Sequence, residues 1–379
     1  MNSKWEYRKI GDVCIVERGG SPRPIDQYIT NDANGINWIK IGDTSESMYI
    51  TETAQKIKPE GMKKSRYVQP GDFLLSNSMS FGRPYILKTD GCIHDGWLVL
   101  RDKNSFFDKR FLYYYLSAKP TYEKFKMIAV GGVVNNLNSE MVRKISVPVP
   151  CKAEQIEIAN LLDIVNRIIL KRKQTLQKLD ELVKARFVEL FGNPVINNKG
   201  WNVSDLGQLT IKIGSGATPK GGKEAYQTDG ISLIRSMNVH NGKFEYKELA
   251  HISDEQAARL ENVAVEENDV LLNITGASVA RSCVVPTNVL PARVNQHVCI
   301  IRCKDSIMPD FINSLLIDDN YQDLLWSIAG SGATREAITK QQVESLQIIL
   351  PPISKQEEFS KFINRVDKSK LLQFFCSPI

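Results

Sequence analysis

Residues 153–191 read AEQIEIANLLDIVNRIILKRKQTLQKLDELVKARFVELF and contain neither proline nor glycine. Apolar residues recur along this stretch at alternating spacings of four and three, which is typical of a coiled-coil seam. Residues 192–194, Gly-Asn-Pro, cannot continue a helix, so the pattern predicts one long helix of about 55–60 Å. The apolar seam positions are Ile158, Leu162, Val165, Ile169, Leu176, Leu179, Val183 and Leu190.

The sequence on either side of this helix is a tandem repeat. The offset between matching segments stays between 195 and 201 residues over the whole half, which indicates a duplication. Matching segments are GINWIK (35–40) and GISLIR (230–235), PGDFLLSN (70–77) and ENDVLLNI (267–274), and VRKISVPVP (142–150) and VESLQIILP (343–351).

Each copy begins with about 150 residues of strand-like segments separated by Gly, Pro and Asn. Helical patterns at 111–126 and 309–328 interrupt them, so the sequence predicts the α+β class, with a long coiled-coil helix after each domain. The predicted parts are a first domain at 1–152, a central spacer helix at 153–194, a second domain at 195–352 and a second, shortened helix at 353–379.

The second helix begins at a capping-box spacing in residues 354–357, and Phe359, Ile363 and Val366 continue its seam. At an offset of 201, the counterpart of residues 179–194 is absent from this copy. We therefore expect part of the first helix seam, between Leu176 and Leu190, to be uncovered. A partner subunit, or self-association through this seam, would then cover it.

Composition is that of an ordinary soluble protein. The chain has 379 residues, of which 42% are hydrophobic and 24% are charged. No segment approaches the roughly 18 apolar residues of a membrane span, so no membrane partner is expected. Seven cysteines without a Cys-x-x-Cys pair favour reduced thiols and a cytoplasmic location.

Motifs for catalysis are missing from the sequence. The four histidines are scattered, no Gly-x4-Gly-Lys-Ser/Thr phosphate loop occurs, and no set of residues has the spacing of metal ligands. We therefore expect a non-catalytic protein that binds neither a metal nor a cofactor itself.

Gly-rich loops with short polar and basic side chains recur at matched positions of the two copies. Glycine lets a backbone approach a ligand, and Asn, Gln, Arg, Ser and Thr can bond to base edges of DNA. Because the side chains differ between the copies, two different targets are expected. The candidate DNA-binding residues are Ser21, Arg23, Lys40, Asn77, Ser78, Arg83, Asn135, Asn136, Thr218, Lys220, Lys223, Arg235, Asn273, Thr275, Arg281, Gln296 and Arg335.

The net charge of +6 is distributed unevenly. Residues 1–150 carry 22 lysines and arginines against 16 aspartates and glutamates, whereas residues 201–352 carry 13 against 18. A domain that held DNA through its own phosphate contacts should not be net acidic. The uneven distribution of charge between the two domains therefore indicates that DNA is bound jointly with a partner protein.

Taken together, these features resemble the specificity (S) subunits of type I restriction–modification systems, over essentially the whole chain. The motifs that carry the resemblance are LFGNP (190–194) followed by Trp201, Trp5 with IGDV (10–13), GATP (216–219), Pro150 with Gln155, and Pro351 with Gln356.

The resemblance implies that each domain is a target recognition domain for one half of a bipartite site in double-stranded DNA. It further implies that the two spacer helices pack antiparallel, set the spacing of the half-sites in a pseudo-twofold arrangement, and dock modification (M) subunits. S-adenosylmethionine-dependent adenine methylation would belong to the M subunits. Cleavage and translocation, with ATP and Mg, would belong to the restriction (R) subunits.

Two other interpretations remain open at this point. The shortened second helix suits a silent or impaired S homologue that serves as a recombination partner. The acidic second domain suits a two-domain scaffold protein that does not bind DNA. A self-contained methyltransferase or nuclease lacks the motifs that its chemistry would need.

Overall fold

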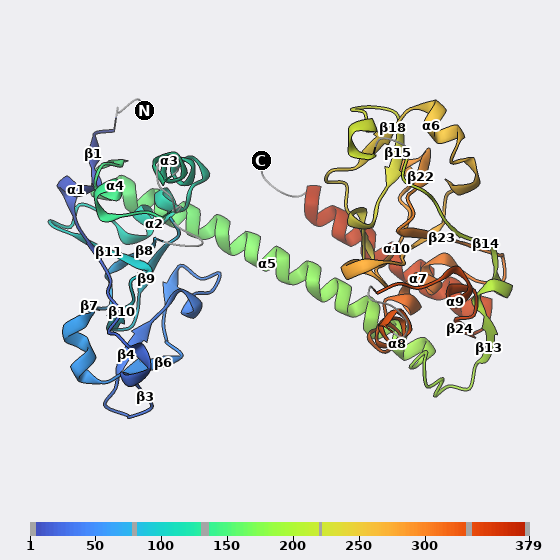
Figure 1. Ribbon diagram of the computed structural model, residues 1–379, viewed down its shortest axis with the longest axis horizontal. Coiled ribbons are helices and arrows are strands. Elements are labelled where there is room, and N and C mark those ends of the chain that lie inside the picture. Colours follow the sequence, from blue (N-terminus) through green and yellow to red (C-terminus); the bar gives the residue numbers. More distant parts are fainter. Residues whose placement is uncertain (1–4, 78–81, 130–135, 220–221, 331–335, 376–379) are drawn as a thin grey trace. The chain divides into compact units, whose positions relative to one another are not determined.

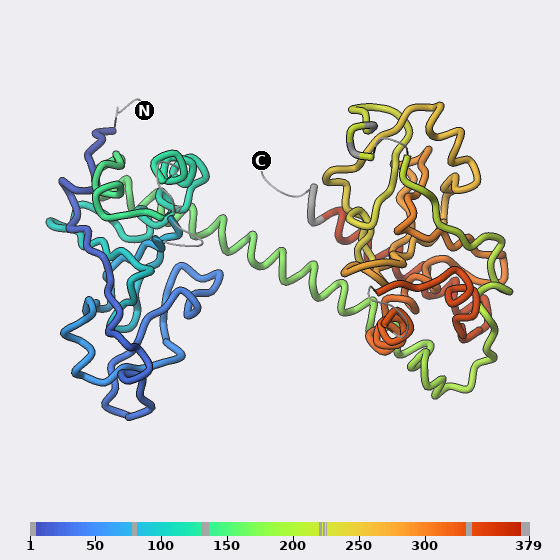
Figure 2. The backbone as a smooth tube through the Cα atoms, viewed as in Figure 1, coloured from blue at the N-terminus to red at the C-terminus, as the bar shows by residue number. Residues whose placement is uncertain are grey.

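The computed structural model describes residues 5–77, 82–129, 136–219, 222–330 and 336–375, without the side chains of 223, 225 and 373–375. The chain forms two compact units, Met1–Leu170 and Lys171–Ile379. Helix α5 (Lys152–Phe191) contributes residues to both units (Figures 1 and 2).

The first unit contains two five-stranded sheets and a short two-stranded one. The first large sheet runs β2 (Cys14–Arg18), β11 (Trp97–Asp102), β8 (Phe73–Ser76), β9 (Pro84–Leu87) and β5 (Tyr49–Ile50). The second runs β3 (Ile29–Thr30), β6 (Gln55–Ile57), β4 (Ile36–Ile39), β10 (Gly91–Ile93) and β7 (Arg66–Val68). The pair is β1 (Tyr7–Lys9) with β12 (Ser146–Pro148), and short helices α1 (Ile10–Val13) and α4 (Ser139–Arg143) lie beside it in sequence.

Strand β8 shows why the central strands are apolar at consecutive positions. Alternate side chains of a strand point to opposite faces of its sheet. Phe73 and Leu75 belong to the core under helices α2 (Lys109–Ser117) and α3 (Lys119–Ala129), whereas Leu74 belongs to the core shared with the second sheet. Because both faces are covered, the first sheet is the middle layer of the unit.

The second unit repeats this plan with four-stranded sheets. The first of these sheets runs β14 (Thr210–Ser215), β23 (Val298–Cys303), β20 (Val270–Asn273) and β21 (Ser282–Val284). The second runs β18 (Ala250–Ile252), β15 (Ile231–Ile234), β22 (Ala292–Val294) and β19 (Ala264–Val265). The pairs are β13 (Asn202–Asp205) with β24 (Gln347–Leu350) and β16 (Val239–His240) with β17 (Lys243–Phe244), and the short helices are α6 (Asp254–Ala258) and α9 (Lys340–Glu344). In β20, Val270 and Leu272 face the helical core while Leu271 faces the second sheet, as in β8.

Each of the two segments predicted to be helical contains a pair of helices. In the first unit, Ala118 is extended and separates α2 from α3, whose first turn contains Pro120. A proline in the first turn lacks only an N–H that would have no helical partner. In the second unit, Ile317 and Asp318 separate α7 (Pro309–Leu316) from α8 (Asp319–Gly330), and Asp318 accepts a hydrogen bond from the backbone N–H of Asn320.

Helix α5 confirms the predicted long helix, and it ends at Gly192, whose φ of +77° favours glycine. Helix α10 spans Ile353–Phe375, 23 residues against the 40 of α5. No helix in the described ranges has both the length and the apolar character that crossing a bilayer would need.

Within the second unit, the end of α5 packs antiparallel on α10. Arg186 forms an ion pair with Glu358 near the start of α10, whereas Asp180 lies 2.8 Å from Lys370 near its end. Phe187 and Phe191 of α5 contact Phe359 with ring centroids 5.7 and 5.4 Å apart, and Phe311 of α7 completes this aromatic cluster. The cluster joins both helices to the core of the unit.

The predicted position of the uncovered seam was wrong. Leu190 is buried, and Leu176, Leu179 and Val183 are half-buried. Phe359 and Ile363 of α10 pack in the same core as Val183 and Leu190, and Val366 of α10 is buried. The exposed seam residues are Val165 and Ile169, while Ile158 and Leu162 are half-buried. The reason is the antiparallel direction, because the start of α10 covers the end of α5 rather than its middle.

A buried glutamine fixes the start of each long helix. Gln155 accepts a hydrogen bond from the backbone N–H of Asp108 at 2.8 Å and donates to the carbonyl of Pro150 at 2.9 Å. Gln356 makes the same two bonds, with the N–H of Met308 and the carbonyl of Pro351, both at 2.9 Å. Both side chains are fully enclosed, so their satisfied bonds hold each long helix against the residue that precedes α2 or α7.

An arginine on the last long strand also repeats. Arg302 on β23 binds the carboxylate of Asp269 at 2.8 Å, and Asp269 is completely buried. Arg101 on β11 binds Asp72 at 3.2 Å, where both side chains keep some exposure. Each arginine also donates to a backbone carbonyl of the neighbouring sheet, Ala264 or Tyr67.

Replacing these two arginines should therefore lower the free energy of unfolding of the two units by different amounts. Arg302→Met leaves the buried carboxylate of Asp269 without its cation and should destabilise the second unit by about 3 kcal/mol. Arg101→Met should cost the first unit only about 1 kcal/mol, because Asp72 remains partly solvated. Denaturant-dependent hydrogen exchange, measured on peptides from each unit, would separate the two values, and equal losses would contradict the argument.

Candidate nucleic-acid interface

In the first unit, the loops at one end of the sheets converge on Asp95. Ser21 donates from Oγ to the Asp95 carboxylate at 2.8 Å, and Arg23 lies 3.5 Å from the same carboxylate. Arg18 and Asn77 donate to the Asp95 backbone carbonyl at 3.1 and 2.8 Å. Asp95 therefore joins the Gly-rich loop after β2 to the segments that follow β8 and β10.

Glycine is required where the first loop crosses this cluster. A Cβ at Gly19 would clash with the backbone carbonyl of His94. The N–H of Gly19 donates to the carbonyl of Trp97 at 2.9 Å, which holds the loop against the strand. This close approach lets the next residues, Ser21 and Arg23, lie over the ends of the strands.

A hollow of about 850 Å³ brings three predicted residues together. Ser21, Arg23 and Lys40 line it, and Trp38, Gln55 and His94 complete its polar and aromatic wall. Lys40 donates from Nζ to Gln55 at 2.7 Å, while the Arg23 side chain is 81% exposed. The exposed guanidinium of Arg23 and the half-buried ammonium of Lys40, beside carboxylate, amide and aromatic groups, provide hydrogen-bonding and stacking groups for an extended polar ligand.

His94 in this wall and the adjacent Asp95 have shifted pKa values. The hydrogen bond from Ser21 lowers the pKa of Asp95 despite partial burial, so the carboxylate is ionised at neutral pH. Burial lowers the pKa of His94, although the Asp95 charge opposes the shift. His94 is thus neutral, and its Nε2 accepts the backbone N–H of Ile41 at 3.1 Å.

The second unit builds the same cluster from different side chains. Thr218, the counterpart of Ser21, donates from Oγ1 to Gln296, which precedes β23 as Asp95 precedes β11. Thr275 lies 2.5 Å from Nδ1 of His297, and Gln296 lies 3.2 Å from its Nε2. His297 therefore links Thr275 to Gln296, and Gln296 in turn bonds to Thr218. As at Gly19, a Cβ at Gly216 would clash with a backbone carbonyl, here that of Val294.

Arg235 takes the position of Lys40 at the end of the matching strand. Its guanidinium donates to the carbonyl of Glu248 and lies over the ring of Tyr226 at 5.2 Å. In both units the backbone N–H of this residue bonds to the side chain three residues later, Asp43 or Asn238. The backbone turn is thus the same in both units, but it carries Lys40 in the first and Arg235 in the second.

The prediction that Asn77 and Asn273 face a ligand was wrong. Both side chains are buried, and Asn273 donates to the carbonyl of Ser236 at 2.8 Å, as Asn77 does to Asp95. Their amide N–H groups hold neighbouring loops together, whereas the buried Oδ1 of Asn273 has no hydrogen-bond partner among the described residues.

The other predicted residues lie apart from the two clusters or outside the described set. Arg83 is exposed and lines a separate hollow with Tyr85 and Tyr113, Asn136 is exposed, and Arg281 is half-buried. Ser78, Asn135, Lys220 and Arg335 lie outside the described residues, as does the side chain of Lys223.

The sequence analysis missed Asp95, His94, Trp38 and Gln55 as members of the first cluster. A usable signal was present for Asp95, because it occupies the position of Gln296 immediately before matched strands. Gln55 joins the cluster only through the pairing of β6 with β4.

Comparison with known proteins identifies the family. A family model described as "Type I restriction modification DNA specificity domain" matches residues 2–181 and again 198–373. The chain belongs to this family. Its function is therefore DNA sequence specificity within the type I restriction–modification class.

Named relatives agree with this assignment. The type I restriction enzyme MjaIX specificity subunit of Methanocaldococcus jannaschii is 23% identical over 95% of this chain and 86% of the relative. The EcoBI specificity subunit of Escherichia coli is 22% identical over 89% of this chain and 74% of the relative. A crystal structure of a type I S subunit from M. genitalium covers 98% of this chain and 91% of its own, with 13% identity and a TM-score of 0.56, which shows a shared fold.

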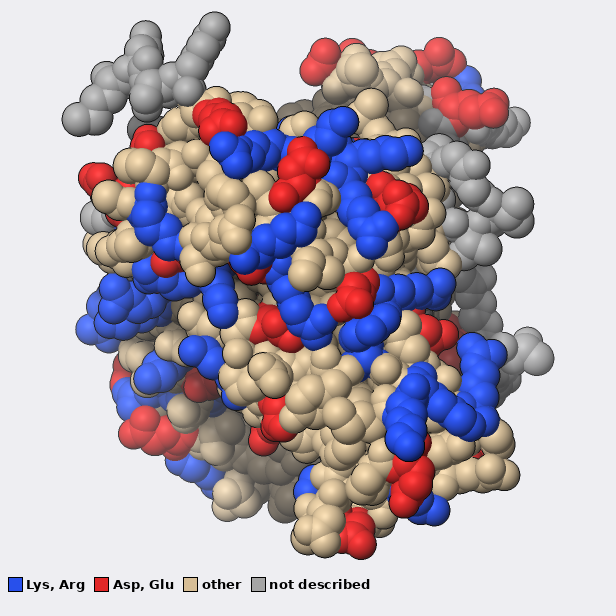
Figure 3. Space-filling view, turned by 90° about the vertical axis from the view of Figure 1, so that its left-hand side faces the viewer, with Lys and Arg blue, Asp and Glu red and all other residues tan. Residues whose placement is uncertain are grey.

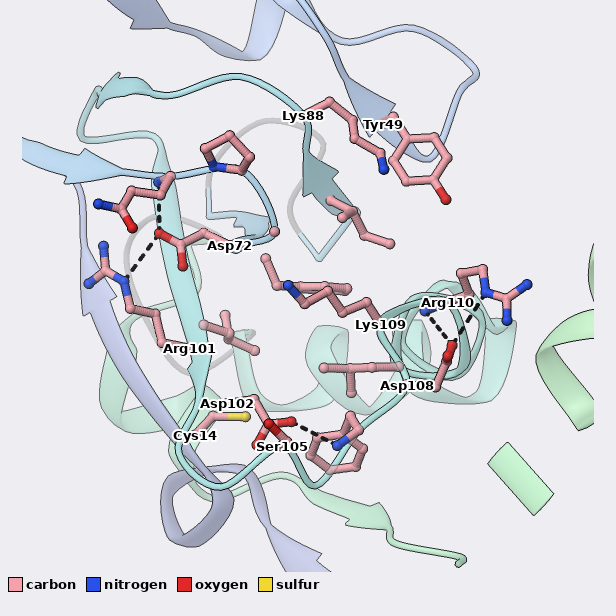
Figure 4. A pocket seen from close by; sticks show the side chains of 18 of the residues that line it. Cys14, Tyr49, Asp72, Lys88, Arg101, Asp102, Ser105, Asp108, Lys109 and Arg110 are labelled. Atoms are coloured by element: carbon pink, nitrogen blue, oxygen red, sulfur yellow. Dashed lines mark hydrogen bonds and ion pairs between the residues drawn. The ribbon is translucent and has the colours of Figure 1, made fainter. Parts of the chain in front are cut away.

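Another hollow, of about 810 Å³, lies in the first unit and is separate from the loop cluster around Asp95. Lys109 reaches into it from the start of α2, and Lys88 lies over the ring of Tyr49 at 4.7 Å (Figure 4). Burial raises the pKa of Cys14 in its wall to about 12, so this thiol is not ionised at neutral pH. In the second unit Pro309 takes the position of Lys109, so this lysine is not repeated there.

The surface of the first unit is rich in cations. Lysine and arginine side chains are spread over the face shown in Figure 3, with acidic side chains between them. This surface agrees with the basic balance of residues 1–150 and suits contacts to phosphates. Among the described residues, no three His, Cys, Asp or Glu side chains lie close enough together to hold a metal ion.

The neutral state of His94 predicts a pH-dependent loop. Because its pKa is lowered in the folded state, stability is complete above the ordinary value of about 6.5 and falls as pH drops through the folded pKa. Hydrogen exchange in residues 39–44, corrected for intrinsic rates, should therefore accelerate between pH 7.5 and 5. His94→Gln should remove this acceleration, and its persistence in that variant would contradict the assignment. Residues 234–239 of the second unit serve as the internal control.

Proposed function

We propose that each unit reads one half of a bipartite DNA site through its loop cluster, and that the two half-sites differ. The clusters centred on Ser21–Asp95 and Thr218–Gln296 are built on matched elements, as a duplicated recognition module requires. The single observation that carries the proposal is that the same hydroxyl-to-acceptor bond occurs in both units with a different acceptor.

The two acceptors suit different base edges. A carboxylate such as Asp95 accepts from the exocyclic amine of cytosine, whereas the amide of Gln296 can both donate to and accept from adenine. Arg23 adds a guanidinium beside Asp95, which is suited to guanine or to a phosphate. Distinct side chains on one backbone frame thus provide distinct specificities.

Binding requires partner subunits in this proposal. The second unit is net acidic, so modification subunits would supply many of its phosphate contacts and dock on the long helices. S-adenosylmethionine would be bound by those subunits, and ATP and Mg by restriction subunits, with this chain contributing no catalytic residue. The complex would act in the cytoplasm, where its DNA is found.

Reciprocal substitutions test whether each unit reads only its own half-site. Asp95→Ala should relax recognition of the first half-site only, and Gln296→Ala that of the second only, each by about 10- to 100-fold at one position. Arg23→Ala and Arg281→Ala should likewise weaken the first and the second half-site, respectively. The measurement is long-read mapping of adenine methylation after the chain and its modification subunit are expressed in a host without endogenous adenine methylation.

Each variant is the control for the other, because both should retain the spacing and the untouched half-site. If either substitution altered both half-sites equally, the assignment of one unit to one half-site would be wrong. If the wild-type complex methylated no bipartite motif, the proposed function itself would fail.

A further inference from the structure

The hollow of about 810 Å³ in the first unit lies at the far end of the first sheet from the loop cluster around Asp95. Cys14, the first residue of β2, lines the hollow, whereas Arg18, the last residue of β2, donates to the carbonyl of Asp95 at 3.1 Å. A strand rises about 3.3 Å per residue, so the two ends of β2 are about 13 Å apart. The hollow is therefore separate from the loops proposed to read DNA bases.

Three exposed lysines from three different elements line this hollow. Lys88 follows β9, Lys109 begins α2 and Lys152 begins α5. Lys152 donates to the carbonyl of Ser105 at 2.9 Å, and Lys88 lies over the ring of Tyr49. Within the described ranges, none of the three lysines forms an ion pair, so their charges are not neutralised there.

The carboxylates in the same lining are already bound by other groups. Asp72 accepts from the guanidinium of Arg101 at 3.2 Å, and Asp102 accepts two backbone N–H groups at 2.9 and 2.7 Å. Asp108 accepts from the N–H groups of the first turn of α2. The lining holds five lysine and arginine residues against three aspartates. An anion that entered the hollow would therefore meet an excess of positive charge.

A glycine makes room for one of the three ammonium groups. Gly71 has a φ of +91°, and a Cβ there would clash with Nζ of Lys109, which reaches into the hollow (Figure 4). The matching turn of the second unit carries Asn268 at a φ of +67°, and Pro309 replaces the lysine. The turn thus accepts a side chain where no lysine follows, and lacks one where the ammonium lies.

The other two lysines are also replaced by apolar residues in the second unit. The paired strands β8–β9 and β20–β21 place Pro286 at the position of Lys88. The glutamine bonds that begin α5 and α10 place Ile353 at the position of Lys152. The shared fold is kept without these charges, so the fold itself does not account for the three lysines.

We propose that this hollow binds a small organic polyphosphate, with the chemistry of a nucleoside di- or triphosphate. Lysine ammonium groups bind phosphate oxygens as point charges, whereas the fork of an arginine is better matched to a planar carboxylate. The two arginines of the lining are occupied, because Arg101 binds Asp72 and Arg110 binds Asp163 at 2.6 Å. Three ammonium groups suit a ligand with more than one phosphate.

The floor of the hollow calls for an organic body on the ligand. Ile86, Leu100 and Leu112 form part of this floor, and the volume lies within the range of pockets for organic ligands. An inorganic phosphate would leave most of that space empty. A bound ligand would also tie the first residues of α2 and α5 to the end of β9, and so act on the attachment of the long helix.

Binding of a fluorescent ADP analogue to the full-length chain, measured by anisotropy without magnesium, tests the proposal. The analogue should bind saturably at one site, and unlabelled ADP should displace it. Lys109→Met should weaken binding at least about tenfold, because a charge-assisted bond to phosphate is lost. Gly71→Asn should also weaken it, because the new side chain displaces the ammonium while asparagine tolerates the positive φ. Lys124→Met, at an exposed lysine of α3 outside the hollow, is the matched control and should leave binding unchanged.

Lysine acetylation of the wild-type chain, followed by mass spectrometry, is a second measurement that needs no substitution. ADP should slow acetylation of Lys88, Lys109 and Lys152 and leave that of Lys124 unchanged. Inorganic pyrophosphate should bind at least about tenfold more weakly than ADP, because it leaves the apolar floor uncovered.

Three results would overturn the proposal. The first is the absence of saturable binding, and the second is equal weakening by Lys109→Met and Lys124→Met. The third is pyrophosphate that binds as tightly as ADP, which would remove the organic body from the ligand. Duplex DNA that displaces ADP and protects the same three lysines would assign the hollow to the DNA backbone instead.

Discussion

Everything in this molecule depends on how each long helix is attached to its domain. Gln155 and Gln356 are buried amides that bond on one side to the backbone where a domain helix begins and on the other to a proline carbonyl. Loss of either bond would leave a buried polar group without a partner, which costs more than the bond itself contributes. The attachment is therefore well defined, and the helix direction out of each domain follows from it.

The residues that hold the fold are distinct from the residues that differ between the two units. The arginines on β11 and β23, the glycines at 19 and 216, and the buried asparagines at 77 and 273 hold equivalent strand ends together in both units. On this frame, Ser21 and Asp95 in one unit are replaced by Thr218 and Gln296 in the other. Specificity can then change without a change of fold, which is the property that a duplicated DNA reader needs.

The sequence predicted the features that depend on local periodicity, namely the α5 helix, the α+β class and the duplication. It misjudged features that depend on contacts between distant segments. Asn77 resembled a ligand-facing loop residue until its partner, the carbonyl of Asp95, was known. The uncovered part of the seam was predicted near the end of α5, whereas the exposed seam residues are Val165 and Ile169 in its first half. Residue spacing alone does not show which end of α10 contacts which end of α5. The pseudo-twofold arrangement of the two units stays a prediction.

The central claim is that the two units are equivalent readers held by equivalent helices. The most direct test is a chain in which residues 1–152 are replaced by a second copy of residues 195–352, expressed with its modification subunit. Mapping of methylated adenines should then show an inverted repeat of the original second half-site, because twofold-related readers recognise inverted sequences. Retention of the original first half-site, or a direct repeat of the second, would contradict the account.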